Sequence, residues 1–235
     1  KWAPFVPFPI DADEQLATFK GKASAYFARL IPWGLDTVRL TFSWEALEPT
    51  KGTYDETYLD RYEAMVDAAH SHGIRVIIDF HQDVYSSPYC GDGFPLWTMS
   101  KPDRAPPCRD NKNWFVAYLQ TPVQDAFKRF FANEDGLLDA FKAMWTKVAT
   151  RFAKYPAVVG FEIINEPGGW RSDNMKTWKD GTLTPFHNEM IALLRKPDVG
   201  GNKLVLFDNP GVEALAANTY HVRPQGDGLI YAPHY

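Results

Sequence analysis

The sequence lacks a strong charge of one sign, a long apolar run and a cysteine set suited to metal binding. Lys and Arg total 25 and Asp and Glu 29, so the formal net charge of the 235 residues is −4. So small a charge gives no support for nucleic-acid binding, which usually needs a strongly basic face. No apolar run approaches the roughly 20 residues of a membrane-spanning helix. No signal peptide is visible, and the abrupt start at Lys1 is compatible with a leader already removed.

The two cysteines, Cys90 and Cys108, lie in one stretch rich in proline and glycine. Without a CxxC pair or nearby histidines they make a poor ligand set, so we predict no metal site and no cofactor. A disulfide closing this loop would stabilise the fold by about 3 kcal/mol on a chain-entropy model. We therefore predict a disulfide-closed loop in a secreted or extracellular protein. The alternative is two unpaired loop thiols in a cytosolic protein.

Apolar residues are plentiful, at 45% of the chain with 15% aromatic, which is enough for the core of one large domain. Five short apolar runs without clean alternation are typical of buried parallel strands. These runs span residues 37–42, 74–80, 158–164, 203–207 and 229–232. Helical spacing predicts a helix from about Tyr58 that ends near Gly73, and another from about Asp135 to Lys154. Alternating strands and helices predict an α/β fold with a parallel sheet.

The connection from Gln82 to about Pro122 interrupts this regularity, because it holds five further prolines and both cysteines. Structureless connections of this length are uncommon inside a domain and often serve as binding lids. We therefore expect a lid over a binding site here.

Polar residues capable of chemistry stand where three of the apolar runs end. These are Asp79-Phe80-His81-Gln82-Asp83, Asn165-Glu166-Pro167 and His234-Tyr235, and Arg39 lies inside the first run. A lone buried charge is costly unless it is paired, so several together indicate one shared pocket. Strand alternation places Glu162 deeper than Glu166 on the same face. We predict an Arg39–Glu162 ion pair and a Glu166 that can reach a ligand; the alternative for Glu166 is an ordinary solvated carboxylate.

Taken in order, these motifs resemble glycoside hydrolase family 5 over nearly the whole chain. The residues that carry the resemblance are Val38-Arg39-Leu40 with Trp44, Glu48-Pro49-x-x-Gly52, Asp79-Phe80-His81, Asn165-Glu166-Pro167 and His234-Tyr235. A narrower resemblance, to the endoglycoceramidase-like branch, rests on the runs 1–7, 81–86 and 91–97.

The resemblance implies a (β/α)8 barrel that hydrolyses β-glycosidic bonds with retention of configuration. It implies that Glu166 is the acid/base and that Asn165 binds the sugar 2-hydroxyl. His234 and Tyr235 would border the nucleophile, and Arg39 would support it electrostatically.

Substrate contacts follow in part from the same resemblance. It implies that Lys1, His81 and Asp83 bind sugar hydroxyls. Trp170 is a candidate stacking platform for a sugar ring, with loop packing as the alternative. The opening stretch rich in Phe, Pro and Trp either lines a groove for lipid, with peripheral contact to a lipid surface, or packs against the barrel.

The chain departs from the family pattern in its extent. The family places the nucleophilic glutamate at the end of strand seven, whereas Tyr235 resembles the end of strand six and Lys1 the segment after strand one. We expect residues 1–235 to form a partial barrel of about strands 2 to 6, lacking the first strand and the last two, with the nucleophile C-terminal to it. Because an open barrel is unfavourable, a further segment or a second chain should complete it. Nothing in the sequence context of Asp208 or Glu213 supports either as a substitute nucleophile.

The leading hypothesis is a secreted retaining glycosidase that cleaves between the glycan and the lipid aglycone of glycosphingolipids. Alternatives within the family are an endoglucanase or a steryl-glucosidase. An alternative of another class is a non-catalytic carbohydrate-binding barrel, which the absence of a glutamate at strand seven would favour.

Overall fold

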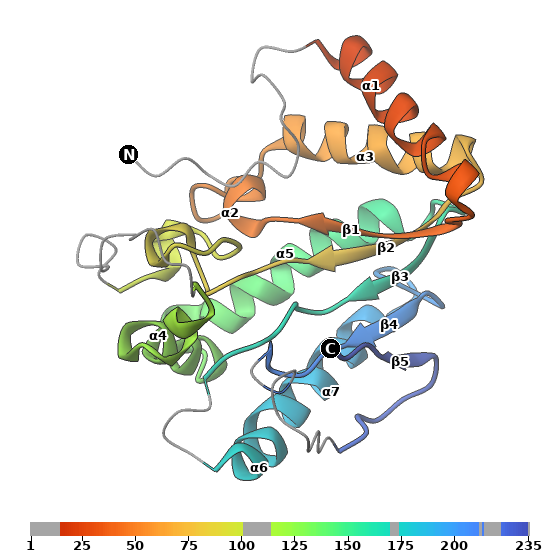
Figure 1. The fold of residues 1–235 in the computed structure, drawn as a ribbon. Helices are drawn as coiled ribbons and strands as arrows, with labels where there is room; N and C mark the ends of the chain where they lie inside the picture. Colours follow the sequence, from red (N-terminus) through yellow and green to blue (C-terminus); the bar gives the residue numbers. More distant parts are fainter. Residues whose placement is uncertain (1–14, 101–113, 170–173, 212, 214–221, 235) are drawn as a thin grey trace.

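A computed structural model of the chain describes residues 15–100, 114–169, 174–211, 213 and 222–234. Five parallel strands form one sheet in sequence order (Figure 1). The strands are β1 (Thr37–Phe42), β2 (Arg75–Phe80), β3 (Val158–Glu162), β4 (Leu204–Phe207) and β5 (Leu229–Tyr231). The five predicted runs and the parallel α/β class are therefore confirmed.

The third strand is shorter than its apolar run because β3 ends at Glu162. The chain beyond it still follows its neighbours. The Ile163 N–H donates to the Leu206 carbonyl at 3.0 Å and the Asn165 N–H to the Phe80 carbonyl at 3.0 Å. These two hydrogen bonds hold the Asn-Glu-Pro segment between the carboxyl ends of β2 and β4.

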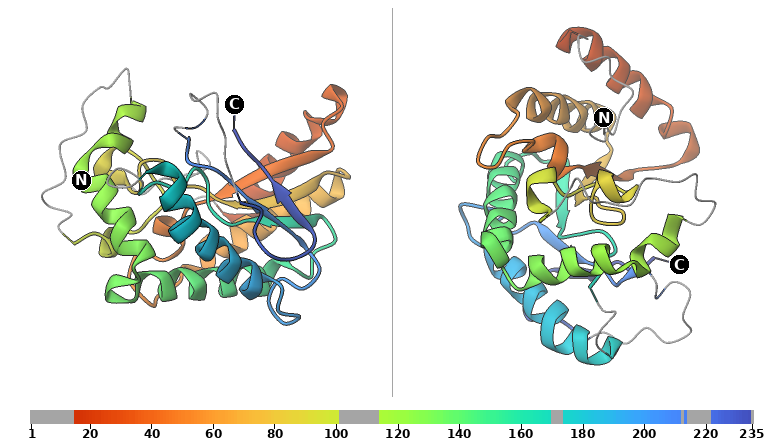
Figure 2. Two further views of the ribbon diagram at one scale, coloured as in Figure 1. Left: turned by 90° about the horizontal axis from the view of Figure 1, so that it is seen from below. Right: turned by 90° about the vertical axis from the view of Figure 1, so that its left-hand side faces the viewer.

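Helices cover one side of the strands as an arc (Figure 2, right). The helices are α1 (Leu16–Ala28), α2 (Trp44–Leu47), α3 (Glu56–Ser71), α4 (Thr121–Phe131), α5 (Leu137–Phe152), α6 (Met175–Trp178) and α7 (Thr184–Leu194). A π-helical turn, η7 (Lys179–Leu183), joins α6 to α7. Within the described residues no helix is both long and apolar enough to cross a membrane.

The two helices predicted from spacing are confirmed. In α3 the Asp55 carboxylate caps the N-terminus by accepting from the Tyr58 N–H at 3.0 Å, and Gly73 follows the helix with a φ of 71°. The second helix, α5, begins at Leu137 rather than Asp135. Asp135 has a φ of 53°, which no right-handed helix contains, so an irregular turn over residues 134–136 precedes α5.

Part of the long connection, around Tyr85 and Phe94, packs into the core, and the expectation of a lid stays untested because residues 101–113 lie outside the described residues. It contains the 3-10 turns Ser87–Tyr89 and Leu96–Thr98. Tyr85 and Phe94 are both 0% exposed. Their rings stack at 4.1 Å, and Phe94 also packs against Trp44 at 5.6 Å. The proline content indicated an irregular backbone correctly, and burial of these two aromatic rings fixes the segment directly after β2 against the core.

Cys108 lies outside the described residues, as do all of residues 101–113. The Cys90–Cys108 disulfide therefore stays a prediction. Cys90 ends the Ser87–Tyr89 turn with a φ of 70°.

Candidate active site

An arginine-centred network joins the first three strands on the inner face of the sheet. Arg39 of β1 donates to both carboxylate oxygens of Glu162 on β3, from Nε at 2.6 Å and from Nη2 at 2.7 Å. Its Nη2 also lies 3.1 Å from Asp79 Oδ2 on β2. The predicted Arg39–Glu162 ion pair is confirmed. Burial raises the pKa of Glu162, although the hydrogen bonds from Arg39 act in the opposite direction.

His81 lies between two carboxylates at the end of β2. Its Nδ1 is 2.9 Å from Asp79 Oδ2, and its Nε2 is 3.5 Å from Asp83 Oδ2. Burial alone would lower the pKa of His81, but the hydrogen bonds to Asp79 and Asp83 outweigh it and raise this pKa to about 10. At neutral pH the ring is therefore a cation whose two N–H groups both donate.

Asn165 is 2% exposed and is held on both sides of its amide. Its Oδ1 accepts from Arg39 Nη2 at 2.8 Å, and its Nδ2 donates to the Gln82 carbonyl at 2.9 Å. The Gln82 side chain in turn donates to the carbonyls of Asn165 at 2.7 Å and Glu166 at 2.9 Å. Gln82 therefore fixes the backbone of the Asn-Glu turn, a role that we did not assign from the sequence although Gln82 stands beside His81 in the strand-end motif.

Glu166 stands on a strained turn rather than on a strand. Its φ is 40°, a left-handed value that non-glycine residues rarely adopt. Because β3 ends at Glu162, strand alternation does not place Glu166, and the turn directs its side chain instead. The Glu166 side chain is 15% exposed, and its Oε1 lies 2.7 Å from His234 Nδ1. The structure thus brings two predicted site residues into direct contact.

Asp208 joins the same group from the end of β4. It is 0% exposed, and its Oδ2 accepts the Glu166 backbone N–H at 3.1 Å. His234 Nε2 lies 3.6 Å from the same oxygen. Burial raises the pKa of Asp208 to about 7, and hydrogen bonding to Glu166 raises the pKa of His234. Sequence analysis missed Asp208 as a site residue, although it follows an apolar run directly, as the predicted site residues do.

Ligand atoms of Glu162, Asp208 and His234 lie within 4.8 Å of one another, as in a possible metal site. Arg39 already occupies both Glu162 oxygens, and the Glu166 N–H occupies Asp208 Oδ2. In the described part of the chain, protein groups therefore already engage the carboxylates of Glu162 and Asp208, whereas His234 Nε2 has only its 3.6 Å contact with Asp208.

Three predicted substrate contacts, Lys1, Trp170 and Tyr235, lie outside the described residues. The others lie together: His81, Asp83, Asn165 and His234 follow the carboxyl ends of strands, and Arg39 reaches this group from the middle of β1.

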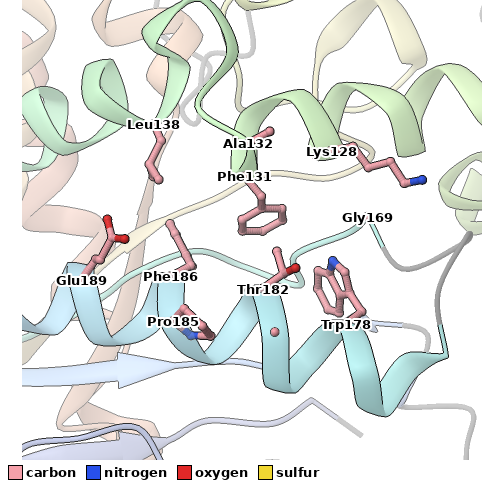
Figure 3. A pocket seen from close by; sticks show the side chains of 11 residues that line it. Lys128, Phe131, Ala132, Leu138, Gly169, Trp178, Thr182, Pro185, Phe186 and Glu189 are labelled. Carbon is pink, nitrogen blue, oxygen red and sulfur yellow. The ribbon is translucent and has the colours of Figure 1, made fainter.

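A separate cavity of about 450 Å³ lies in the helical layer between α4 and α7 (Figure 3). Its walls are mainly aromatic and aliphatic side chains, among them Phe131, Trp178 and Phe186. Gly169, three residues beyond Glu166 in the sequence, also lines it. The cavity thus adjoins the segment that carries Glu166, but the titratable network described above does not line it.

Parallel strands that bring a buried charge network to their carboxyl ends are the arrangement of (β/α)8-barrel enzymes. The chain belongs to glycosyl hydrolase family 5, because the family model "Cellulase (glycosyl hydrolase family 5)" matches residues 11–235. The family resemblance and the barrel fold predicted from the motifs are confirmed, and the five strands form part of such a barrel.

Individual members of the family are also similar to this chain. The endoglycoceramidase of Cyanea nozakii is 36% identical over 154 residues, which cover 57% of this chain and 31% of that protein. The ergosteryl-beta-glucosidase of Saccharomyces cerevisiae is 39% identical over 77 residues, which cover 32% of this chain and 10% of that protein.

The solved structure of endo-glycoceramidase II from Rhodococcus sp. matches 90% of this chain and 50% of its own, with 29% identity and a TM-score of 0.76. Other structures of that enzyme are a lactosyl-enzyme intermediate and a ganglioside GM3 complex. The chain therefore spans about half of that solved chain and about a third of the Cyanea relative.

Proposed function

We propose that the protein is a retaining β-glycosidase that cleaves the bond between the glycan and the lipid aglycone of glycosphingolipids, with Glu166 as its acid/base. The observation that carries this proposal is the placement of Glu166. Its carboxylate is held on a strained turn at the carboxyl ends of the barrel strands and is hydrogen-bonded to His234. Similarity to endoglycoceramidases, one of which is solved with ganglioside GM3, supports the substrate class.

In the proposed first step, Glu166 donates its proton to the glycosidic oxygen as the bond to the anomeric carbon breaks. In the second step its carboxylate takes a proton from the water that hydrolyses the glycosyl-enzyme intermediate. His234, whose Nδ1 lies 2.7 Å from Glu166 Oε1, keeps the carboxylate in one orientation through both steps.

Retention also needs a nucleophilic carboxylate about 5 to 5.5 Å from the acid/base. Among the described residues near Glu166, Glu162 is bound by Arg39 through both oxygens, and Asp208 accepts backbone N–H groups from Glu166 and Asn209. Neither is free to attack a sugar. We therefore propose that the nucleophile is a glutamate encoded C-terminal to Tyr235, next to the Arg39 network.

Sugar hydroxyls are proposed to bind at His81, Asp83 and Asn165. His81 and Asp83 are partly open, at 22% and 29% side-chain exposure, and together offer a cationic donor and an anionic acceptor. Lys1, Trp170 and Tyr235 remain proposed contacts of the same sugar. The same proposal includes secretion and peripheral contact with a lipid surface, because glycosphingolipids, the proposed substrates, are membrane lipids.

A second candidate is a glucosidase acting on a steryl glucoside, which the similarity to the ergosteryl-beta-glucosidase favours. A substrate panel separates the two. An endoglycoceramidase releases an intact oligosaccharide and ceramide from a ganglioside, whereas a steryl-glucosidase releases glucose from a steryl glucoside.

The direct test is Glu166→Gln in the chain together with all the flanking sequence that its gene encodes. Loss of the proton donor should lower turnover of a ganglioside about 10²- to 10⁴-fold, because general acid catalysis contributes that much. Chromatography of the released oligosaccharide measures the rate.

Glu134→Gln is the matched control, since Glu134 is 56% exposed and lies in the turn before α5. It should leave turnover unchanged. Near-normal turnover by Glu166→Gln would rule out the assignment, and an inactive parent protein would favour the non-catalytic binding barrel.

A further inference from the structure

We call the segment after β4 that contains Asp208, Asn209, Gly211 and Glu213 the β4 exit. The β4 exit contacts Glu166 from two sides. The first contact is to its backbone. Asp208 Oδ2 accepts the Glu166 N–H at 3.1 Å while Asp208 Oδ1 accepts the Asn209 N–H at 2.6 Å. The buried carboxylate of Asp208 therefore ties the strained turn of Glu166 to the β4 exit, and such external contacts are what hold a strained residue in place.

The second contact is to the Glu166 side chain. A Cβ placed on Gly211 would lie 2.6 Å from Glu166 Cδ, a separation that real Cβ atoms do not show. Gly211 does not have a positive φ, so its backbone conformation would suit other residues. The backbone at Gly211 lies directly against the acid/base carboxylate, so any larger residue at this position would displace the Glu166 side chain.

A buried ion pair anchors the far end of the β4 exit. Lys179 Nζ donates to Glu213 Oε2, and the side chains of Lys179 and Glu213 are 0% and 6% exposed. Removing two charges from water is costly, and such pairs are weak evidence for stability. Their best-attested use is to fix one arrangement of the groups around them.

Lys179 owes its position to a local irregularity. It opens the π-turn η7, which lies inside an otherwise continuous helical stretch from Met175 to Leu194. A π-turn adds one residue to the helix and is frequent at functional sites. Gly181 and Thr182 of the same turn line the cavity of Figure 3, so η7 faces that cavity and the β4 exit at once.

We propose that Lys179 is a positioning residue for the acid/base. Its ion pair with Glu213 pins the β4 exit, so that Gly211 and Asp208 hold the Glu166 carboxylate and backbone in one place. This inference rests on the proposed function for its catalytic consequence, and it adds residues that no strand-end motif contains.

The test compares two lactosides that differ only in the leaving group. Departure of an alkyl alcohol needs a proton from Glu166, whereas departure of 2,4-dinitrophenolate needs almost none. Lys179→Met in the full-length protein should lower kcat/KM, which reports the first step, on the alkyl lactoside at least about tenfold, and change kcat/KM on the dinitrophenyl lactoside much less. Lys179→Arg, which keeps the charge, should recover a large part of the loss. Equal losses on both substrates would show a merely structural role and overturn the proposal.

Gly211→Ala keeps the test decisive if Lys179→Met does not fold. Its methyl group meets the Glu166 carboxylate directly, so the same selective loss on the alkyl lactoside is expected. Equal kinetics of Gly211→Ala and the parent on both lactosides would contradict the inference.

A titration separates this inference from the proposed function. ¹⁵N NMR of His234 in Lys179→Met should show a lower pKa than in the parent protein, because the hydrogen bond to Glu166 is loosened. An unchanged His234 titration overturns the positioning role. If the parent hydrolyses no glycoside, the proposed function fails, while the NMR result still decides the positioning.

Discussion

At the residue scale, the site is a set of titratable groups whose neighbours decide their charge. His81 is kept cationic between Asp79 and Asp83, whereas burial favours the neutral form of Asp208. Arg39 supplies a permanent positive charge to Glu162. At neutral pH Arg39 and His81 therefore keep a positive charge, whereas Asp208, with a pKa of about 7, changes its charge in that range.

His81→Gln should make stability less dependent on pH. The pKa of His81 is about 10 in the fold, against about 6.5 in an unfolded chain. Its stabilising contribution is therefore complete below about pH 6.5 and is lost as the pH rises to about 10. We expect a loss of about 2–3 kcal/mol at pH 6, typical of hydrogen bonds to charged groups, and a smaller loss near pH 10. Denaturant unfolding at both values measures it, and a loss that grows with pH would contradict this account.

At the element scale, the segment after β2 behaves as part of the core. Gly93 has a φ of 109°, and a Cβ there would lie 2.7 Å from Gln82 Cα. The close approach brings Phe94 beneath the strand ends, where it stacks on Tyr85. A free lid would have few such contacts.

Gly93→Ala should therefore destabilise the protein by more than about 2 kcal/mol, because it combines an unfavourable φ with a backbone clash. Gly21→Ala is the matched control. Gly21 lies in α1 with nothing within 4 Å of an added Cβ, so alanine there should be neutral or stabilising by up to about 1 kcal/mol. Thermal unfolding compares the two variants, and equal transition temperatures would show that the segment is loosely packed.

At the scale of the whole molecule, the five strands present an inner face that carries the charge network and an outer face covered by helices. β1 and β5 each pair on one side only among the described strands. A (β/α)8 barrel closes when such edges are joined by further strands. The proposed nucleophile comes from that remaining part of the barrel.

A disulfide between Cys90 and Cys108 would be consistent with the proposed secretion. Reduction should lower the thermal transition modestly, because the cross-link stabilises by at most about 3 kcal/mol for a loop of this size. Peptide mass mapping without reductant should find the two cysteines in one cross-linked pair. Two free thiols would dismiss the disulfide and remove this support for secretion.

The sequence by itself determined the parallel α/β class, the positions of the five strands and the helices α3 and α5. It also determined which residue types gather at the strand ends. These are local properties, since apolar spacing and the polar residues that end an apolar run can be read within a dozen positions.

Only the tertiary structure decided how those residues meet. Arg39 and Glu162 are 123 residues apart in the sequence, and Glu166 and Asp208 are 42 apart. The contacts of Gln82, the left-handed φ of Glu166 and the burial of Phe94 depend equally on neighbours from other elements. Such partners are selected by packing and charge pairing in the folded chain, and for that reason no local pattern contains them.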